Sequence, residues 1–198
     1  KRVDQQHDVQ VVQMLFMAKQ QHLFSRLHQR RKGHLLKNQQ TEKTNVMRIF
    51  DQKKVVYTPH CYLMSGAISG VDTAAALNEP VERVFKTLVT VGHSRNHYVF
   101  LVPVDKDLDL KKAASAVNEK SIEMIKSKDL LGLTGYIHGG CSPVGMKKPF
   151  KTVIDDTAKD FETIYFSAGK IGYQVETNIS ELKKVIDFDL KDVKGDKI

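Results

Sequence analysis

The segment Gly139-Gly140-Cys141-Ser142-Pro143-Val144-Gly145-Met146-Lys147-Lys148 is the most distinctive stretch of this chain. Its glycines permit tight turns and let the backbone approach a ligand closely. The loop would expose backbone N–H groups beside two lysines, which suits a ligand that carries phosphates and a polar carbonyl. A second stretch, Phe85-Lys86-Thr87-Leu88, places one ammonium group inside an apolar run. Together the two stretches predict a phosphate- and carbonyl-binding site.

The composition is that of a globular protein. The chain has 198 residues, of which 41% are hydrophobic and 27% charged, so a sizeable core is expected. No apolar run approaches the roughly 20 residues of a membrane helix, and no signal peptide is expected. The cysteines, Cys61 and Cys141, are too few for a disulfide scaffold. We therefore expect a cytoplasmic protein.

Positive charge is concentrated at the start of the chain. Residues 1–42 hold eight Lys or Arg and three acidic residues, so they carry +5 of the net +8. Apolar residues recur at helical spacing over 9–31, which predicts a basic amphipathic helix, and 37–42 reads as a linker. We expect a domain boundary near residue 42. The extension could contact a polyanion such as RNA, mediate oligomerisation, or be an upstream or expression-derived segment.

From residue 43 onward, short strands and helices alternate, which predicts an α/β (α+β) domain with a mixed sheet. Thr44 is expected to cap the first helix, Asp72 the second, and Asn178 or Ser180 the last. Pro59 suggests an edge strand. The predicted helices cover 44–50, 72–77, 110–117, 121–126 and 179–186. The predicted strands cover 55–62, 86–91, 98–104, 152–155, 163–167 and 173–177.

Four motifs give the chain a resemblance to a known family. They are Lys43-Thr44-Asn45-Val46-Met47-Arg48-Ile49, Val84-Phe85-Lys86-Thr87-Leu88-Val89, the glycine loop preceded by Gly135-Tyr136, and Phe161-Glu162-Thr163-Ile164-Tyr165 followed by Ser167-Ala168-Gly169-Lys170. From Lys43 onward the chain resembles the YbaK/EbsC aminoacyl-tRNA deacylases, which are related to the editing domain of prolyl-tRNA synthetases. The resemblance implies a twisted, partly barrel-like mixed β-sheet flanked by helices.

The resemblance also implies a reaction. Members of this family remove cysteine from mischarged tRNA-Pro, and tRNA-Cys is a further candidate substrate. Cysteine and proline have similar volumes, so one pocket separates them poorly and a second hydrolytic sieve is needed. In the family the thiol of the substrate is thought to attack its own ester carbonyl, releasing a thiolactone without an enzyme nucleophile or cofactor. The site only has to fold the aminoacyl group correctly.

Two other functions remain open at this point. One is removal of alanine from tRNA-Pro by a close relative, and the other is a non-catalytic nucleotide- or RNA-binding module. The expected partner is the 3′ end of an aminoacylated tRNA. The sequence leaves open whether prolyl-tRNA synthetase is also a partner and which oligomeric state the chain adopts, and no membrane partner is expected.

The resemblance assigns roles to individual residues. Lys86 would polarise the ester, and Gly139 and Gly140 would contribute backbone groups to the same step. The expected substrate-binding residues are Tyr62, Thr87, Ser142, Pro143, Gly145, Lys147, Ser167, Ala168 and Gly169. Structural interpretations compete with these roles, because glycines also build turns and Lys147 with Lys148 could form a solvated basic pair. His60 could line the adenine side with Tyr62.

The loop cysteine is not expected to act as a nucleophile. His138 lies three residues before Cys141, but no third orienting group stands at a recognisable spacing. No cysteine or histidine pair has metal-ligand spacing, so no metal is expected.

Overall fold

The structure is a computed structural model that describes residues 42–196. The predicted helix over 9–31 and, except for Glu42, the predicted linker lie outside these residues. The elements from Lys43 onward belong to one unit. The boundary near residue 42 and the roles considered for the N-terminal extension stay predictions.

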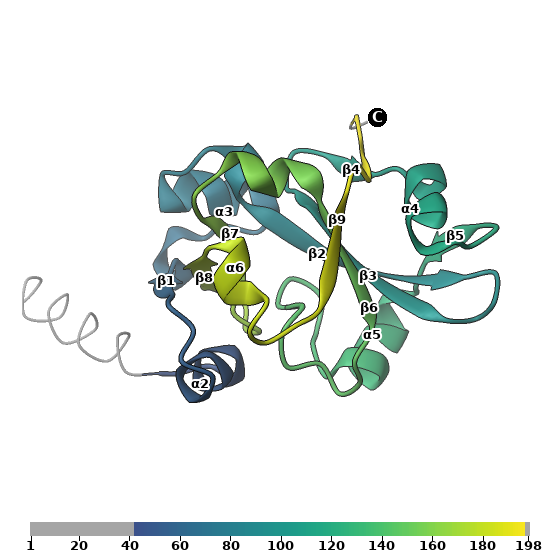
Figure 1. The fold of residues 1–198 in the computed structure, drawn as a ribbon. Helices are drawn as coiled ribbons and strands as arrows, with labels where there is room; N and C mark the ends of the chain where they lie inside the picture. The colour runs from purple at the N-terminus through teal and green to yellow at the C-terminus, as the bar shows by residue number, and fades with distance from the viewer. Residues whose placement is uncertain (1–41, 197–198) are drawn as a thin grey trace, which may run out of the picture. The chain divides into compact units, whose positions relative to one another are not determined.

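A five-stranded mixed sheet crosses the middle of this unit (Figure 1). Its strands, in spatial order, are β5 (Ile122–Met124), β2 (Phe85–Gly92), β3 (His97–Pro103), β6 (Lys151–Asp155) and β9 (Phe188–Lys191). The β5–β2 and β2–β3 pairs are antiparallel, whereas the β3–β6 and β6–β9 pairs are parallel. The mixed sheet that the sequence predicts is confirmed.

A second sheet contains three antiparallel strands in the order β1 (Thr58–Cys61), β8 (Tyr173–Thr177) and β7 (Ile164–Ser167). β1 is an edge strand, as Pro59 predicts. A parallel bridge between Val84 and Tyr165 links the start of β2 to β7. This bridge joins the two sheets and gives the partly barrel-like arrangement. A short pair, β4 (Asp107–Leu108) with β10 (Lys194–Gly195), completes the strands of the described residues.

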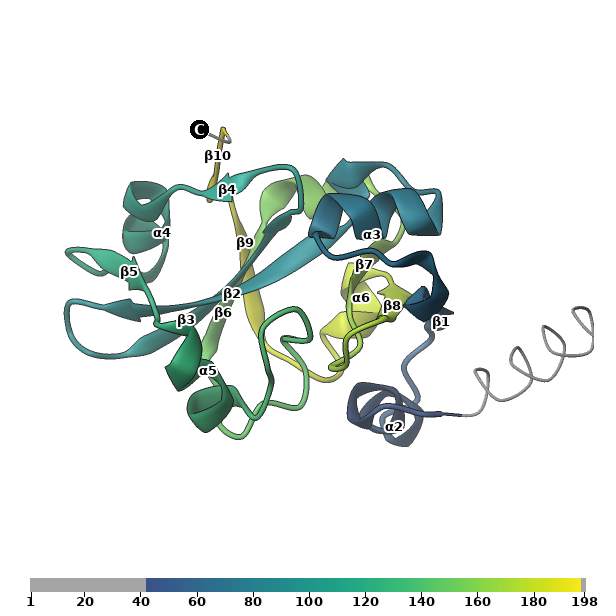
Figure 2. The ribbon, with the colours of Figure 1, turned by 180° about the vertical axis from the view of Figure 1, so that it is seen from behind.

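Helices flank the sheets (Figures 1 and 2). The α-helices are α2 (Asn45–Gln52), α3 (Gly70–Leu77), α4 (Leu110–Val117), α5 (Ser127–Thr134) and α6 (Ile179–Leu182). Three 3-10 helices are η1 (Leu63–Ser65), η2 (Val81–Arg83) and η3 (Asp156–Asp160). In both views α3 lies beside β7 at one end of the unit and α4 lies beside β5 at the other. Among residues 42–196 no helix is long and apolar enough to cross a membrane.

β3 is buried on both faces, which explains its near-continuous apolar sequence. Val99 and Leu101 belong to the main core, which also contains Val46 and Phe50 of α2. The alternate residues of β3, with Phe100 at their centre, belong to a second core that includes the alanines of α4. The central strand therefore separates two cores, one beneath α2 and one beneath α4.

Two of the three predicted helix N-caps are confirmed, and the third differs. Thr44 and Asn178 are the N-caps of α2 and α6, as expected. α3 begins earlier than predicted, because Ser69 is its N-cap and Asp72 is the third helical residue. The two side chains form a capping box, so Asp72 stabilises the helix start without being the cap.

The prediction of a helix over 121–126 is wrong. This segment forms β5, whose three residues pair with the end of β2 through Thr90–Gly92. Six residues span fewer than two helical turns, too few for a periodic pattern to identify a helix, so the available strand edge decides the conformation. α5, β9 and β10 were not predicted either.

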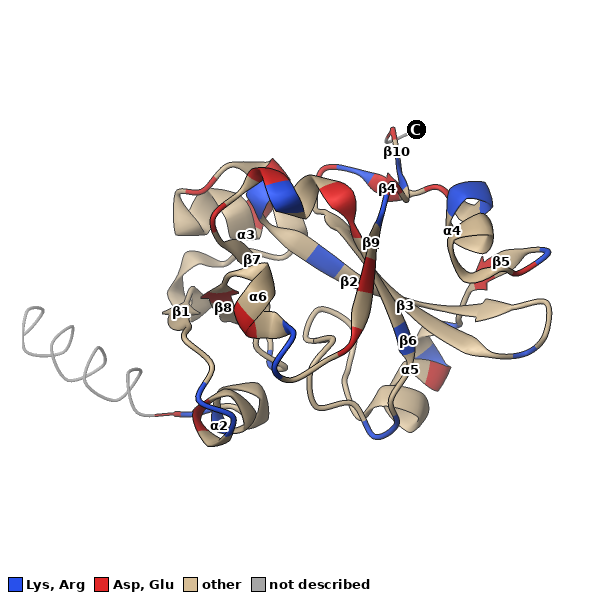
Figure 3. Cartoon of the chain, viewed as in Figure 1, with Lys and Arg blue, Asp and Glu red and all other residues tan. Residues whose placement is uncertain are grey.

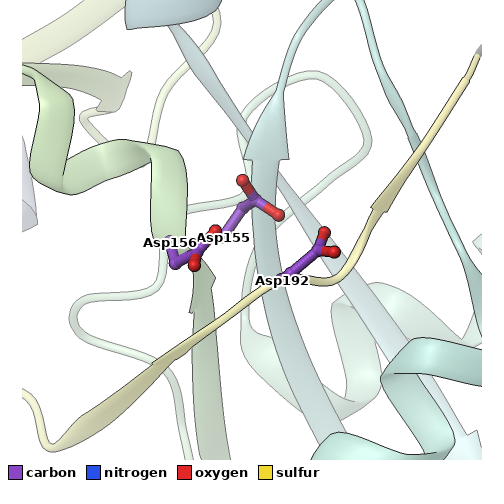
Figure 4. Close-up of side chains that lie close together, drawn as sticks. All are labelled: Asp155, Asp156 and Asp192. Carbon is purple, nitrogen blue, oxygen red and sulfur yellow. The ribbon is translucent and has the colours of Figure 1, made fainter.

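A buried carboxylate holds the C-terminal strand in place. Asp155 is fully buried, and its Oδ2 accepts hydrogen bonds from the backbone N–H groups of Val193 and Lys194, each at 2.9 Å. Burial acts to raise the pKa of Asp155, but hydrogen bonds from Thr157, Val193 and Lys194 outweigh it and lower the pKa below the usual value. Asp156 and Asp192 lie beside it (Figure 4).

We predict that Asp155→Asn lowers the free energy of unfolding by about 2 kcal/mol, because charge-assisted hydrogen bonds to two backbone donors are lost. The pKa of Asp155 is lower in the folded state, so its contribution is complete above pH about 4 and disappears as the pH falls through the folded value. Denaturant unfolding of both proteins at pH 7 and at pH 3 measures this. An equal difference at the two pH values would contradict the assignment.

Candidate functional site

A cavity of about 500 Å³ lies against the first half of β2. Its walls come from segments that are far apart in the sequence. These segments are the loop and helix start over 62–73, the segment 124–130 that links β5 to α5, the glycine loop, and the facing ends of β7 and β8. Val84 and residues 85–89 of β2 run along it. The topology therefore brings the two stretches singled out in the sequence to one hollow.

Five of the predicted site residues line this cavity: Tyr62, Lys86, Thr87, Gly139 and Ser167. They come from four different parts of the fold, so their convergence depends on the tertiary structure. Their roles in binding or catalysis stay predictions.

The other predicted site residues do not line the cavity: Gly140, Ser142, Pro143, Gly145, Lys147, Ala168 and Gly169. Ser142 and Ala168 have no exposed surface. A side chain at Gly145 would collide with Ile49 and Tyr136, and one at Gly169 would collide with Tyr136. Both glycines have positive φ angles, so they provide the tight packing of two loops around Tyr136.

Lys147 and His60 make contacts within the protein. The ammonium group of Lys147 donates hydrogen bonds to the carbonyl oxygens of Leu131, at 3.1 Å, and Gly132 in α5. A cation at this end of a helix is favourable, because the last carbonyl groups lack partners within the helix. His60 lies 3.0 Å from a carboxylate oxygen of Glu176 and does not line the cavity. Neither contact was expected from the sequence.

The edge of β2 that faces away from β3 has a short opening along the cavity. The carbonyl of Val84 accepts from the N–H of Val104, and the N–H of Gly92 donates to Asn96, so the even-numbered residues of β2 bond to β3. In an antiparallel ladder the intervening residues direct their backbone groups the other way. That edge is bridged to β7 at Val84, accepts the N–H of Ile125 at Val89 and pairs with β5 at Thr90–Gly92. The backbone groups of Thr87, between these contacts, therefore face the cavity side of the strand.

Two buried polar atoms at the cavity have no hydrogen-bond partner. They are Oγ1 of Thr87 and Oε1 of Gln174, and both residues line the hollow. Unpaired buried polar atoms are rare in folded proteins, and both oxygens can accept a hydrogen bond from a bound ligand. Gln174 was not identified from the sequence, because one glutamine in the strand segment Tyr173-Gln174-Val175 carries no motif.

Lys86 is held by a carboxylate. Its Nζ lies 3.1 Å from Oδ1 of Asp107 on β4, and 28% of the lysine side chain is exposed. Asp107 pairs with Gly195 of β10, the strand whose first residue, Lys194, is bonded to Asp155. The position of the lysine therefore depends on the C-terminal part of the described chain. Asp107 was also missed, because only the tertiary structure brings it to Lys86.

Cys141 lines the cavity but is poorly suited to nucleophilic attack. Only 8% of the residue is exposed, and burial raises the pKa of its thiol to about 12. A thiol with this pKa is almost fully protonated at pH 7, whereas catalytic cysteines have lowered pKa values. His138 also lines the cavity. This environment supports the interpretation of Cys141 as a packing residue.

One acidic cluster in the described part of the chain has the spacing of a metal site. It consists of Asp155, Asp156 and Asp192 (Figure 4), none of which lines the cavity. Lys194 approaches both Asp155 and Asp192, and Lys112 pairs with Asp192 at 2.9 Å. These lysines compensate the negative charge, and Figure 3 shows residues of both signs around β4, β10 and the start of α4.

Comparison with known proteins identifies the family. Residues 67–185, more than half of the chain, match the aminoacyl-tRNA editing domain. The chain belongs to this family. The matched range contains the cavity-lining parts of β2, the glycine loop, β7 and β8.

Similar proteins include both free-standing and embedded editing domains. A protein of Enterococcus faecalis, provisionally named Cys-tRNA(Pro)/Cys-tRNA(Cys) deacylase EbsC, is 43% identical over 143 residues, covering 72% of this chain and 87% of that protein. A proline–tRNA ligase of Lactobacillus helveticus is 30% identical over 127 residues, which cover 62% of this chain and 22% of the ligase. The chain thus spans about a fifth of the synthetase.

A solved structure supports the fold. A protein described as a candidate trans-editing enzyme for prolyl-tRNA synthetase superposes with a TM-score of 0.66 at 22% identity, covering 76% of this chain and 94% of that one. The twisted mixed sheet flanked by helices, which the resemblance implies, is confirmed.

We predict that the native protein reacts at Cys61 and not at Cys141 when treated with a thiol reagent at pH 7.5, because Cys61 is exposed and Cys141 is buried. The chain contains two cysteines, so titration with dithionitrobenzoate should give one equivalent before denaturation and two after it. The variant Cys61→Ser should give none before denaturation. Rapid reaction of this variant would show that Cys141 is a reactive thiol.

Proposed function

We propose that this chain is an aminoacyl-tRNA deacylase that removes cysteine from mischarged tRNA-Pro, with Cys-tRNA-Cys as a further substrate. Family membership and the name of the Enterococcus relative support the reaction class. The observation that carries the proposal is the composition of the cavity. It combines Lys86, unpaired polar groups and the glycine loop, while its own thiol is buried and protonated.

The proposed reaction uses the thiol of the substrate. Its sulfur attacks the carbonyl carbon of the cysteinyl ester, forming a carbon–sulfur bond, and the bond between this carbon and the ribose oxygen breaks. The thiol proton ends on that ribose oxygen, so cysteine leaves as a thiolactone and the tRNA keeps its 3′-terminal hydroxyl. Each atom is accounted for without an additional reactant.

Lys86 is proposed to stabilise the negative charge that develops on the carbonyl oxygen. An ammonium group in a partly buried site stabilises an oxyanion more strongly than it would in water. Asp107 restricts where the lysine can point, which lowers the entropy lost on reaching the reactive arrangement.

The rest of the site is proposed to hold the substrate. Gly139 permits close approach of its backbone to the ester, and the unpaired oxygen atoms of Thr87 and Gln174 accept hydrogen bonds from the ammonium or hydroxyl groups of the aminoacyl-adenosine end. Ser167 contributes a further part of the cavity wall. These contacts orient the cysteinyl group so that sulfur lies next to its own carbonyl.

The biological setting follows from this function. The partner is aminoacylated tRNA, and translation takes place in the cytoplasm. We propose that the protein works in trans and meets the tRNA either free or near prolyl-tRNA synthetase. Pull-down with that synthetase, with and without tRNA, distinguishes the two.

We predict that Lys86→Ala lowers the rate of cysteine release from Cys-tRNA-Pro at least a hundredfold, because a charge that stabilises the oxyanion is lost. The assay follows radiolabelled cysteine on tRNA under single-turnover conditions. Lys151→Ala is a matched control, since Lys151 belongs to a strand of the same sheet but does not line the cavity. Equal rates for wild type and Lys86→Ala would refute the catalytic assignment.

The amino acid specificity gives a second prediction. Cys-tRNA-Pro should be deacylated, whereas Ala-tRNA-Pro and Ser-tRNA-Pro should be stable, because neither carries a thiol. Rapid release of alanine would favour the Ala-tRNA-Pro alternative. Salt-dependent tRNA binding without release of any amino acid would favour a non-catalytic binding module.

A further inference from the structure

Exposed apolar side chains recur in and beside the segments that line the cavity. Ten large hydrophobic residues of the described chain are exposed, and two of them, Ile68 and Met124, line the cavity. Six more lie in the lining segments or next to them in sequence: Leu63, Met64, Val71, Leu131, Ile137 and Ile171. Single exposed apolar residues are normal, whereas several that adjoin one site can mark a binding surface.

Two of these side chains belong to both the cavity and the surface. Ile68 is 95% exposed and Met124 is 46% exposed, yet each contributes to the cavity wall. They come from different segments, the loop before α3 and the end of β5. The outer surface is therefore continuous with the interior of the site at both places.

Further apolar side chains extend this surface along the glycine loop. Leu63 packs against Gly172, where an added Cβ would collide with it, and Ile171 lies 3.7 Å from the position of a Cβ on Gly139. Met64, beside Leu63, is 74% exposed. We call these five side chains the apolar rim: Leu63, Met64, Ile68, Met124 and Ile171.

The loop that carries most of the rim is fixed at both ends. The N–H of Tyr62 donates to the carbonyl of Gly172 at 2.8 Å, and Ser69 begins α3 with its capping box. The apolar side chains between these anchors are thus presented to solvent by an ordered framework. Contact of these apolar side chains with water is unfavourable in free energy, so covering them would favour the binding of a ligand.

We propose that the apolar rim binds the unpaired bases that precede the terminal nucleotide of an RNA 3′ end. This inference rests on the proposed function, because an aminoacyl ester in the cavity is covalently attached to that terminal nucleotide. The nucleotides before it must leave the cavity across its mouth. Their bases have apolar faces, and proteins hold unstacked bases between aromatic or apolar side chains.

The test compares two short fluorescein-labelled RNAs by anisotropy. One is the tetranucleotide ACCA, and the other has the same backbone with both cytosine bases removed. We expect wild-type protein to bind the intact RNA about tenfold more tightly. The double variant Met64→Ser/Ile68→Ser should lose this preference. Val56→Ser is the matched control, since Val56 is 73% exposed and lies outside the cavity-lining segments, and it should keep the preference.

Both altered residues are exposed, so the variants should fold normally, and circular dichroism checks this. If the double variant keeps the base preference, the proposal is wrong. This result is expected if the rim binds a protein instead of RNA. The wild-type protein could also deacylate Cys-tRNA-Pro and yet bind both RNAs equally well. That result would refute the proposed role of the rim but not the deacylase function. A rim-dependent base preference without turnover supports the rim and refutes the deacylase function.

Discussion

The hydrogen bonding of β2 is the constraint on which the site depends. One edge of this strand is paired with β3 along its whole length, while the other is bridged to β7 at the start and paired with β5 at the far end, which leaves an opening between them. Apolar side chains packed over the open part of the edge would bury its backbone N–H and C=O groups without hydrogen-bond partners, which is unfavourable. The fold surrounds it with a cavity, and the substrate-binding residues of this proposal lie along that opening.

Much of the fold could be predicted from the sequence, because its central strands are strongly apolar and its helix starts carry capping residues. The site was predictable only in part. Lys86 and Gly139 stand out in sequence and also line the cavity. Gln174 and Asp107 do not stand out, since a single polar residue in a strand has no periodic signature. β5 was mistaken for a helix because pairing with β2 outweighs its weak local preference.

The glycine-rich segments serve two purposes that the sequence cannot separate. Gly139 lies at the cavity, whereas Gly145 and Gly169 make room for Tyr136 and the residues of α2. A similar division applies to the lysines. Lys86 lies at the cavity, and Lys147 stabilises the end of α5. A motif in this family therefore combines residues that hold the loop with residues available to a ligand.

The link from Asp155 through β10 and β4 to Lys86 makes the lysine depend on residues more than a hundred positions later in the sequence. Asp155 accepts from the N–H groups of Val193 and of Lys194, the first residue of β10, β10 pairs with β4, and β4 carries the carboxylate that holds the lysine. A pair of two-residue strands such as β4 with β10 makes few backbone hydrogen bonds, and such elements often open locally at a lower free energy than that of global unfolding. Opening of β10 would release Lys86 from its partner while the rest of the cavity stayed intact. Hydrogen exchange at Val193 and Lys194 would therefore report how often the site loses the orientation of this lysine.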